Sequence, residues 1–194
     1  MMHLLCTMLA LAWLWLLIVC PPLAADPVIH ETVRKYRISG QTAQELRREM
    51  DRKGPAGAGG RRFDGHTAWW LNWNYHWWEN PTECRLTAVT TLLRVSFTLP
   101  AWDQYERGSK ELKQKWDRYY EALYAHEKGH REFGLRAARD IEQVIWGIGR
   151  RETCTQLERE ANAAAQATLD HYIQLEKRYD IETAHGAATG AVFP

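Results

Sequence analysis

The chain has 194 residues, 45% of them hydrophobic, which is enough to bury the core of one domain. Its 25 lysines and arginines almost balance its 24 aspartates and glutamates, for a net charge of +1. A balance of this kind creates no overall field that would favour nucleic acid or an anionic membrane, so neither is expected as a partner.

The first 25 residues differ from the rest of the chain. Residues 4–19 are almost all apolar, and a Cys-Pro-Pro-Leu-Ala-Ala stretch follows them. This pattern is typical of a secretory signal peptide that is cleaved after Ala25. We therefore expect a signal peptide at 1–25 and a single domain at 26–194, which is exported to the periplasm or secreted. Once the signal is cleaved, no stable membrane association is expected.

Two alternatives to cleavage stay open. The N-terminal segment could remain as an uncleaved anchor, although about 16 apolar residues are few for a membrane span. Cys20 also allows a lipoprotein, but Val19 precedes it where a small residue is expected. Export with cleavage is the interpretation that we follow.

Export changes how the cysteines are interpreted. Removal of the signal peptide leaves Cys84 and Cys154 in the mature chain. In an oxidising compartment, two cysteines most simply form a disulfide with each other. This bond would join the predicted strands to a late helix, close a loop of about 70 residues and stabilise the fold by roughly 4 kcal/mol.

The mature chain begins with a predicted strand and a predicted helix. Residues 27–38 are rich in Val, Ile, Thr and Tyr, which favours a strand. Thr42 and Glu45 have the spacing of a capping box, which indicates the start of a helix at 43–52. A Gly-Pro pair at 54–55 is expected to end this helix.

Two further stretches alternate with a period of two and predict strands, at 67–78 and at 84–99. The second stretch forms one or two strands, and Pro100 is expected to stop it. The first stretch has a face of large side chains that comprises Trp69, Leu71, Trp73, Tyr75 and Trp77. Such a face can stack on carbohydrate, but it more commonly belongs to a core, and we assign it to the core.

Two helices complete the predicted fold. Ser109 is expected to cap a long helix that runs to about residue 148, and a second helix is expected at 154–179. The apolar residues of the long helix recur every three or four positions, and His126 and His130 lie on this apolar stripe. The elements together predict an α+β fold, in which a small antiparallel sheet packs on the long helix and on the second helix in a minimal zincin-like arrangement.

The long helix carries the HExxH pattern at His126-Glu127-Lys128-Gly129-His130. Residues four apart lie on the same face of a helix, so both imidazoles can bind one metal ion. Glu127 is turned about 100° around the helix and can act on a water at that metal. This combination predicts a Zn²⁺-dependent peptidase that hydrolyses a peptide or protein substrate, with Glu127 as the general base.

Charged neighbours of the pattern support a different interpretation. Lys128, Arg131 and Glu132 would suit a solvated surface helix in which the two histidines bind nothing. The position of His126 and His130 on an apolar stripe favours the metal site, because two imidazoles without a partner fill a core poorly.

A polar segment at 179–186 follows the second predicted helix. Within it, His185 is the predicted third metal ligand. Asp180 could orient a ligand histidine by a hydrogen bond, or it could be the third ligand itself. Tyr179 is the predicted oxyanion donor.

The order of these motifs resembles a family of secreted bacterial zinc-dependent proteases, over most of the mature chain. The resemblance rests on Tyr36 to Thr42, Phe63-Asp64-Gly65-His66-Thr67, Cys84, Thr98-Leu99-Pro100, the motif at 126–130, Cys154 and Tyr179 to Gly186. It implies zinc-dependent hydrolysis, and it implies that the segment with His185 belongs to the site.

Two other functions are also compatible with the sequence. Residues 127–130 and 182–185 both read ExxH, and paired ExxH motifs occur in di-metal carboxylate bundles, although such bundles contain no strands. The alternative is an exported binding protein in which a structural zinc site is closed by a fourth ligand, for which His66, His76 and His171 are candidates. The sequence specifies neither the substrate nor the oligomeric state.

Overall fold

The computed structural model describes residues 26–57 and 60–194. The predicted signal peptide at 1–25 lies outside the described residues. The elements in chain order are β1 (Val28–Ile38), α1 (Ala43–Lys53), β2 (His66–Asn80), β3 (Glu83–Trp102), α2 (Lys110–Gly147), β4 (Arg150–Arg151) and α3 (Cys154–Glu182), with short 3₁₀ helices at Tyr105–Arg107 and Ala187–Thr189.

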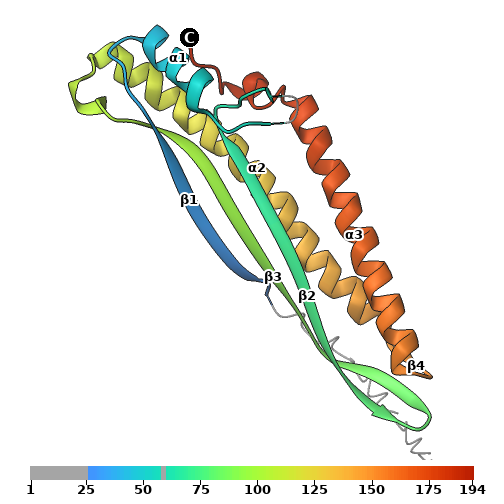
Figure 1. Ribbon diagram of the computed structural model, residues 1–194. Helices are drawn as coiled ribbons and strands as arrows, with labels where there is room; N and C mark the ends of the chain where they lie inside the picture. Colours follow the sequence, from blue (N-terminus) through green and yellow to red (C-terminus); the bar gives the residue numbers. More distant parts are fainter. Residues whose placement is uncertain (1–25, 58–59) are drawn as a thin grey trace, which may run out of the picture.

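A long twisted sheet extends beside two long helices, α2 and α3 (Figure 1). The strand order is β1-β3-β2, and β4 pairs with the start of β3. The predicted α+β class is confirmed. The sheet is mixed rather than wholly antiparallel, because β1 runs parallel to β3 while β2 runs antiparallel to it. After β1, the chain passes through α1 and runs back in the opposite direction along β2. Strand β3 then reverses direction again, so it runs parallel to β1, which pairs with the edge of β3 that β2 does not occupy.

Strand β3 is one continuous strand that extends beyond the predicted stop at Pro100 to Trp102. The prediction of a stop was wrong because proline disrupts a strand only where a neighbour needs its N–H. Among the described residues, the pairing of β2 with β3 ends at His66 and Thr98. Strand β2 therefore has no residue opposite Pro100. The N–H that proline lacks is not needed by a β2 carbonyl at this position.

The predicted helices are confirmed together with their caps. The Thr42 hydroxyl accepts a hydrogen bond from the Glu45 amide, and the Glu45 carboxylate bonds back to the Thr42 amide, which completes the capping box of α1. The Ser109 hydroxyl caps α2 by accepting from the Leu112 amide. Both caps satisfy amides that the first turn of a helix leaves without partners.

The core lies between the sheet and the helices in two clusters. One cluster joins residues 93–99 of β3 to residues 112–123 of α2, and the other surrounds the start of β3 and the start of α3. Most of the predicted aromatic face of β2 packs against these clusters, as expected: Trp69, Leu71, Trp73 and Tyr75. Trp77 is 41% exposed, because the pairing of β2 with β3 shifts between His76 and Trp77.

The predicted disulfide between Cys84 and Cys154 is confirmed. It joins the start of β3 to the first residue of α3. Across residues 26–57 and 60–194, no helix combines the length and the hydrophobicity that a membrane span requires.

Candidate metal centre

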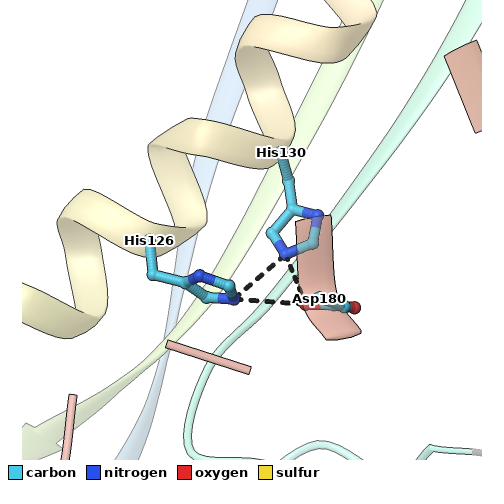
Figure 2. Close-up of side chains that lie close together, drawn as sticks. All are labelled: His126, His130 and Asp180. Carbon is cyan, nitrogen blue, oxygen red and sulfur yellow. Dashed lines mark hydrogen bonds and ion pairs between the residues drawn. The ribbon is translucent and has the colours of Figure 1, made fainter. Parts of the chain in front are cut away.

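Three side chains from two helices converge on one point (Figure 2). The Nε2 atoms of His126 and His130, on α2, lie 3.2 Å apart. The Oδ1 atom of Asp180, in the last turns of α3, lies 3.3 Å from the first nitrogen and 3.1 Å from the second. Atoms that bind zinc tetrahedrally at about 2.0–2.1 Å lie roughly 3.3–3.4 Å from one another. The spacing of the three atoms therefore suits a single metal ion.

The electrostatics of this group also suit a cation. His126 and His130 are buried, with 4% and 7% of their surface exposed, as the apolar stripe predicted. Burial alone would raise the pKa of Asp180, but hydrogen bonds from the two histidines outweigh this effect and lower it. Burial lowers the pKa of His130, but Asp180 and Glu176 outweigh it and raise the pKa to about 9. The carboxylates thus stabilise positive charge at this point.

Glu176 orients the ring of His130. Its Oε1 atom lies 3.0 Å from Nδ1 of His130 and accepts a further hydrogen bond of 2.9 Å from Nε1 of Trp69. A carboxylate only accepts, so Nδ1 carries a proton, and in the neutral form of His130 the Nε2 lone pair is left for a metal. Glu176 was not predicted from the sequence. Its position four residues before Asp180, on the same face of α3, is the signal that could have identified it.

Tyr179 packs the motif helix against α3. Its ring stacks on that of His126, with 5.0 Å between the ring centres, and its hydroxyl donates to the backbone carbonyl of the same histidine over 3.3 Å. Gly129 makes room for this contact, because a Cβ at that position would lie 2.3 Å from the hydroxyl. The described hydroxyl is directed at the helix backbone, and the oxyanion role stays a prediction.

His185, the predicted third ligand, lies beside the group rather than within it. Its Nδ1 atom is 3.4 Å from Oδ1 of Asp180, and its ring packs against Phe63. The convergent atoms belong to His126, His130 and Asp180, so the described geometry favours Asp180, the other ligand considered from the sequence. The part played by His185 at the metal stays a prediction.

The other residues considered as ligands are spread over the described chain. His76 and His171 are exposed on β2 and α3, and Glu182, from the second ExxH pattern, is exposed at the end of α3. His66 lines the cavity beside the metal group. Within the described residues, His126, His130 and Asp180 form the group whose atoms come close enough to hold a metal ion.

The group opens onto a cavity of about 680 Å³. The cavity is bordered by the loop before β2, by the motif helix and by the end of α3, and its lining includes Phe63, His66, Leu123 and Lys177. A ligand on a bound metal would therefore have access to a space of the size that small molecules and peptide side chains occupy.

Glu127 lines the same cavity and is 4% exposed. The hydroxyl of Thr67 donates a 2.7 Å hydrogen bond to its Oε2 atom. Burial raises the pKa of Glu127, although the hydrogen bond from Thr67 opposes the increase. A raised pKa makes a carboxylate a better proton acceptor near neutral pH. The arrangement thus combines a candidate metal group with an adjacent base.

A family model described as "Bacterial protein of unknown function (DUF922)" matches residues 33–186. The matched range contains the three convergent residues, Glu127 and His185. No curated protein and no solved structure shows significant similarity to the chain.

Proposed function

The chain belongs to the DUF922 family of bacterial proteins of unknown function, and from the geometry of its site we propose that it is a zinc-dependent metallopeptidase. One observation carries the proposal. His126, His130 and Asp180 converge beside a cavity that also contains the buried carboxylate of Glu127.

The ligand set supports zinc. Two imidazole nitrogens and one carboxylate oxygen form one of the ligand sets of catalytic zinc sites, which have three protein ligands and one open position, whereas structural sites usually have four protein ligands. When it is bound, zinc supplies a Lewis acid that lowers the pKa of water and polarises a carbonyl group.

The residues of the chain perform the remaining steps of hydrolysis. The carboxylate of Glu127 accepts a proton from the water whose oxygen attacks the peptide carbonyl carbon. It then delivers this proton to the amide nitrogen as the carbon–nitrogen bond breaks. Glu176 holds His130 in the tautomer that leaves Nε2 available as a ligand. The products are a free carboxylate and a free amine, so water is the only co-reactant and no oxidant is needed.

The disulfide supports an exported location. Cys84 and Cys154 are bonded to each other, and such bonds persist in oxidising compartments. We therefore propose that the protein acts in the periplasm or outside the cell on a peptide or protein substrate, and that it associates with neither nucleic acid nor a membrane.

Metal content and hydrolysis test the proposal together. The protein is recovered from the periplasm of an expression host, and zinc, iron and cleavage of an unstructured protein substrate are measured. We expect one zinc per chain and measurable cleavage. His126→Ala should bind no zinc and show no cleavage. Glu127→Gln should keep its zinc, but its rate of cleavage should fall about 100-fold or more.

Other results would identify a different function. Two irons per chain would indicate a di-metal carboxylate site. Zinc with four protein ligands in an X-ray absorption spectrum, together with no cleavage, would indicate a structural site.

A further inference from the structure

The stretch Phe63-Asp64-Gly65-His66-Thr67 comprises the end of the loop before β2 and the first two residues of β2. It is part of the family resemblance, but none of its residues belongs to the metal group. The side chain of Thr67 is buried against the motif helix, with 5% of the residue exposed. Its hydroxyl lies 2.7 Å from Oε2 of Glu127 and 3.1 Å from the backbone carbonyl of the same residue. A hydroxyl has one proton, and the shorter contact is the one to the carboxylate.

Gly65 contacts the other carboxylate oxygen. A Cβ built at this glycine would lie 2.6 Å from Oε1 of Glu127, closer than carbon and oxygen approach without displacement. Any other residue would therefore push the carboxylate away. Both oxygens of Glu127 thus lie beside the same short stretch of chain: Oε2 is hydrogen-bonded to Thr67, and Oε1 lies close to Gly65, and both of these residues line the cavity.

The loop itself is fixed from three sides. Arg47 on α1 forms hydrogen bonds with both carboxylate oxygens of Asp64, and the Tyr119 hydroxyl on α2 donates to the same carboxylate over 2.7 Å. The Tyr36 hydroxyl on β1 donates to the backbone carbonyl of Asp64, also over 2.7 Å. A loop held in this way can hold another side chain in a defined position.

From these contacts we infer that Gly65 and Thr67 form a clamp that fixes the carboxylate of Glu127, with Thr67 as a positioning residue for peptide hydrolysis. The inference rests on the proposed function. The hydrogen bond occupies Oε2 with Thr67 and leaves Oε1 to accept the proton of the attacking water. A base must lie within hydrogen-bond reach of that proton, and a displacement of about 1 Å can reduce a rate roughly 100-fold.

The molecule contains a matched control for this contact. The hydroxyl of Thr91 on β3 donates a 2.7 Å hydrogen bond to Oε1 of Glu142 on α2, and both residues are almost completely buried. Glu142 lies fifteen residues after Glu127, about 22 Å along the helix. Thr91 and Thr67 therefore make the same kind of contact to the same helix, but only Thr67 makes it at the metal group.

The experiment compares zinc-loaded wild type, Thr67→Val, Thr67→Ser and Thr91→Val. For each protein we would measure kcat and KM, zinc affinity by competition with a chelator, and thermal stability. We expect Thr67→Val to lower kcat roughly 10- to 100-fold, while KM and zinc affinity change less than about threefold. Thr67→Ser should recover most of the rate. Thr91→Val should lower the thermal stability about as much as Thr67→Val does, while its kcat should equal that of the wild type.

Three results would overturn the clamp: an unchanged kcat in Thr67→Val, no recovery in Thr67→Ser, or an equal loss of kcat in Thr91→Val. An inactive wild type would overturn the proposed function instead. In that case, crystal structures of zinc-loaded wild type and Thr67→Val still decide on the clamp. A displaced Glu127 carboxylate in the variant supports it, and an unmoved carboxylate overturns it.

Discussion

The Nδ1 atom of His130 lies 3.0 Å from Oε1 of Glu176, so α3 both supplies a candidate ligand and orients one on α2. We predict that Glu176→Ala weakens zinc binding about 10- to 100-fold, because the ring of His130 loses the acceptor that fixes its tautomer. Chelator competition at constant pH measures this loss. Glu182→Ala, an exposed position on the same helix, is the control and should bind zinc like the wild type.

Asp180 and His185 can be distinguished by metal content. Because the carboxylate of Asp180 lies 3.3 Å and 3.1 Å from the two histidine nitrogens, Asp180→Ala should lose zinc during dialysis. His185→Ala should retain one zinc per chain, since His185 contacts Asp180 from outside the convergent group. The opposite pattern, with zinc lost only from His185→Ala, would make His185 the third ligand.

The stability of the metal-free protein should depend on pH through His130. Burial lowers the pKa of this residue, but hydrogen bonds with Asp180 and Glu176 raise it from 6.5 to about 9. The pKa is higher in the folded than in the unfolded state, so the stabilisation is complete below pH 6.5 and is lost as the pH rises through about 9. The Tm in the presence of a chelator should therefore fall across this range.

Zinc and a variant provide the controls for this pH dependence. Added zinc replaces the proton, so the zinc-loaded protein should show a smaller fall in Tm over the same range. In the metal-free variant His130→Gln, the part of the fall in Tm that comes from His130 should also be absent. An identical fall in His130→Gln and in the wild type would contradict the assignment.

Gly129 should not tolerate a side chain. The Cβ of Gly129→Ala would lie 2.3 Å from the Tyr179 hydroxyl, so the Tyr179 ring must leave its position on His126 or α3 must move away from the motif helix. We expect a lower Tm and weaker zinc binding, although alanine favours a helix by about 1 kcal/mol over glycine. Gly147→Ala, where nothing lies within 4 Å, is the matched control on α2 and should be neutral or slightly stabilising. Equal behaviour of the two variants would contradict the close contact.

The disulfide should affect stability but not the metal group. It closes a loop with a sequence separation of 70 residues. Removal by Cys84→Ala together with Cys154→Ala should reduce the free energy of unfolding by about 4 kcal/mol. Asp180 lies twenty-six residues after Cys154, about 39 Å along α3, so zinc affinity at low temperature should be unchanged. Denaturant titration and chelator competition measure the two quantities, and a large loss of zinc affinity would contradict this separation.

Local patterns predicted the elements of the fold well. The capping box at Thr42, the cap at Ser109 and the stripe that contains His126 and His130 depend on residues three or four apart, and all were correct. The parallel pairing of β1 with β3 was not predicted. It joins strands more than sixty residues apart, and no local signal specifies it. The continuation of β3 through Pro100 depends on where β2 begins, at His66 opposite Thr98, which is also non-local information.

The residues of the candidate site also fall into two groups: those that local spacing predicts and those that depend on contacts between distant parts of the chain. His126, His130 and Glu127 were identified from the sequence as candidate ligands and candidate base because they lie within about one turn of one helix. The position of Asp180 depends on how α3 crosses α2, so spacing alone left it as an alternative to His185. Glu176 and Thr67 contact the motif helix across 46 and 60 residues of sequence, and neither was predicted to have a role.

The division of the candidate ligands between α2 and α3 also has a consequence for biosynthesis. A chain that emerges from its N-terminus presents the two histidines and Glu127 before it presents Asp180. The three candidate ligand atoms meet only after both helices have been made and packed together. If the protein is exported as proposed, a precursor that is still crossing the membrane would hold only part of the metal group. Hydrolytic activity would arise after folding, in the compartment to which the protein has been delivered.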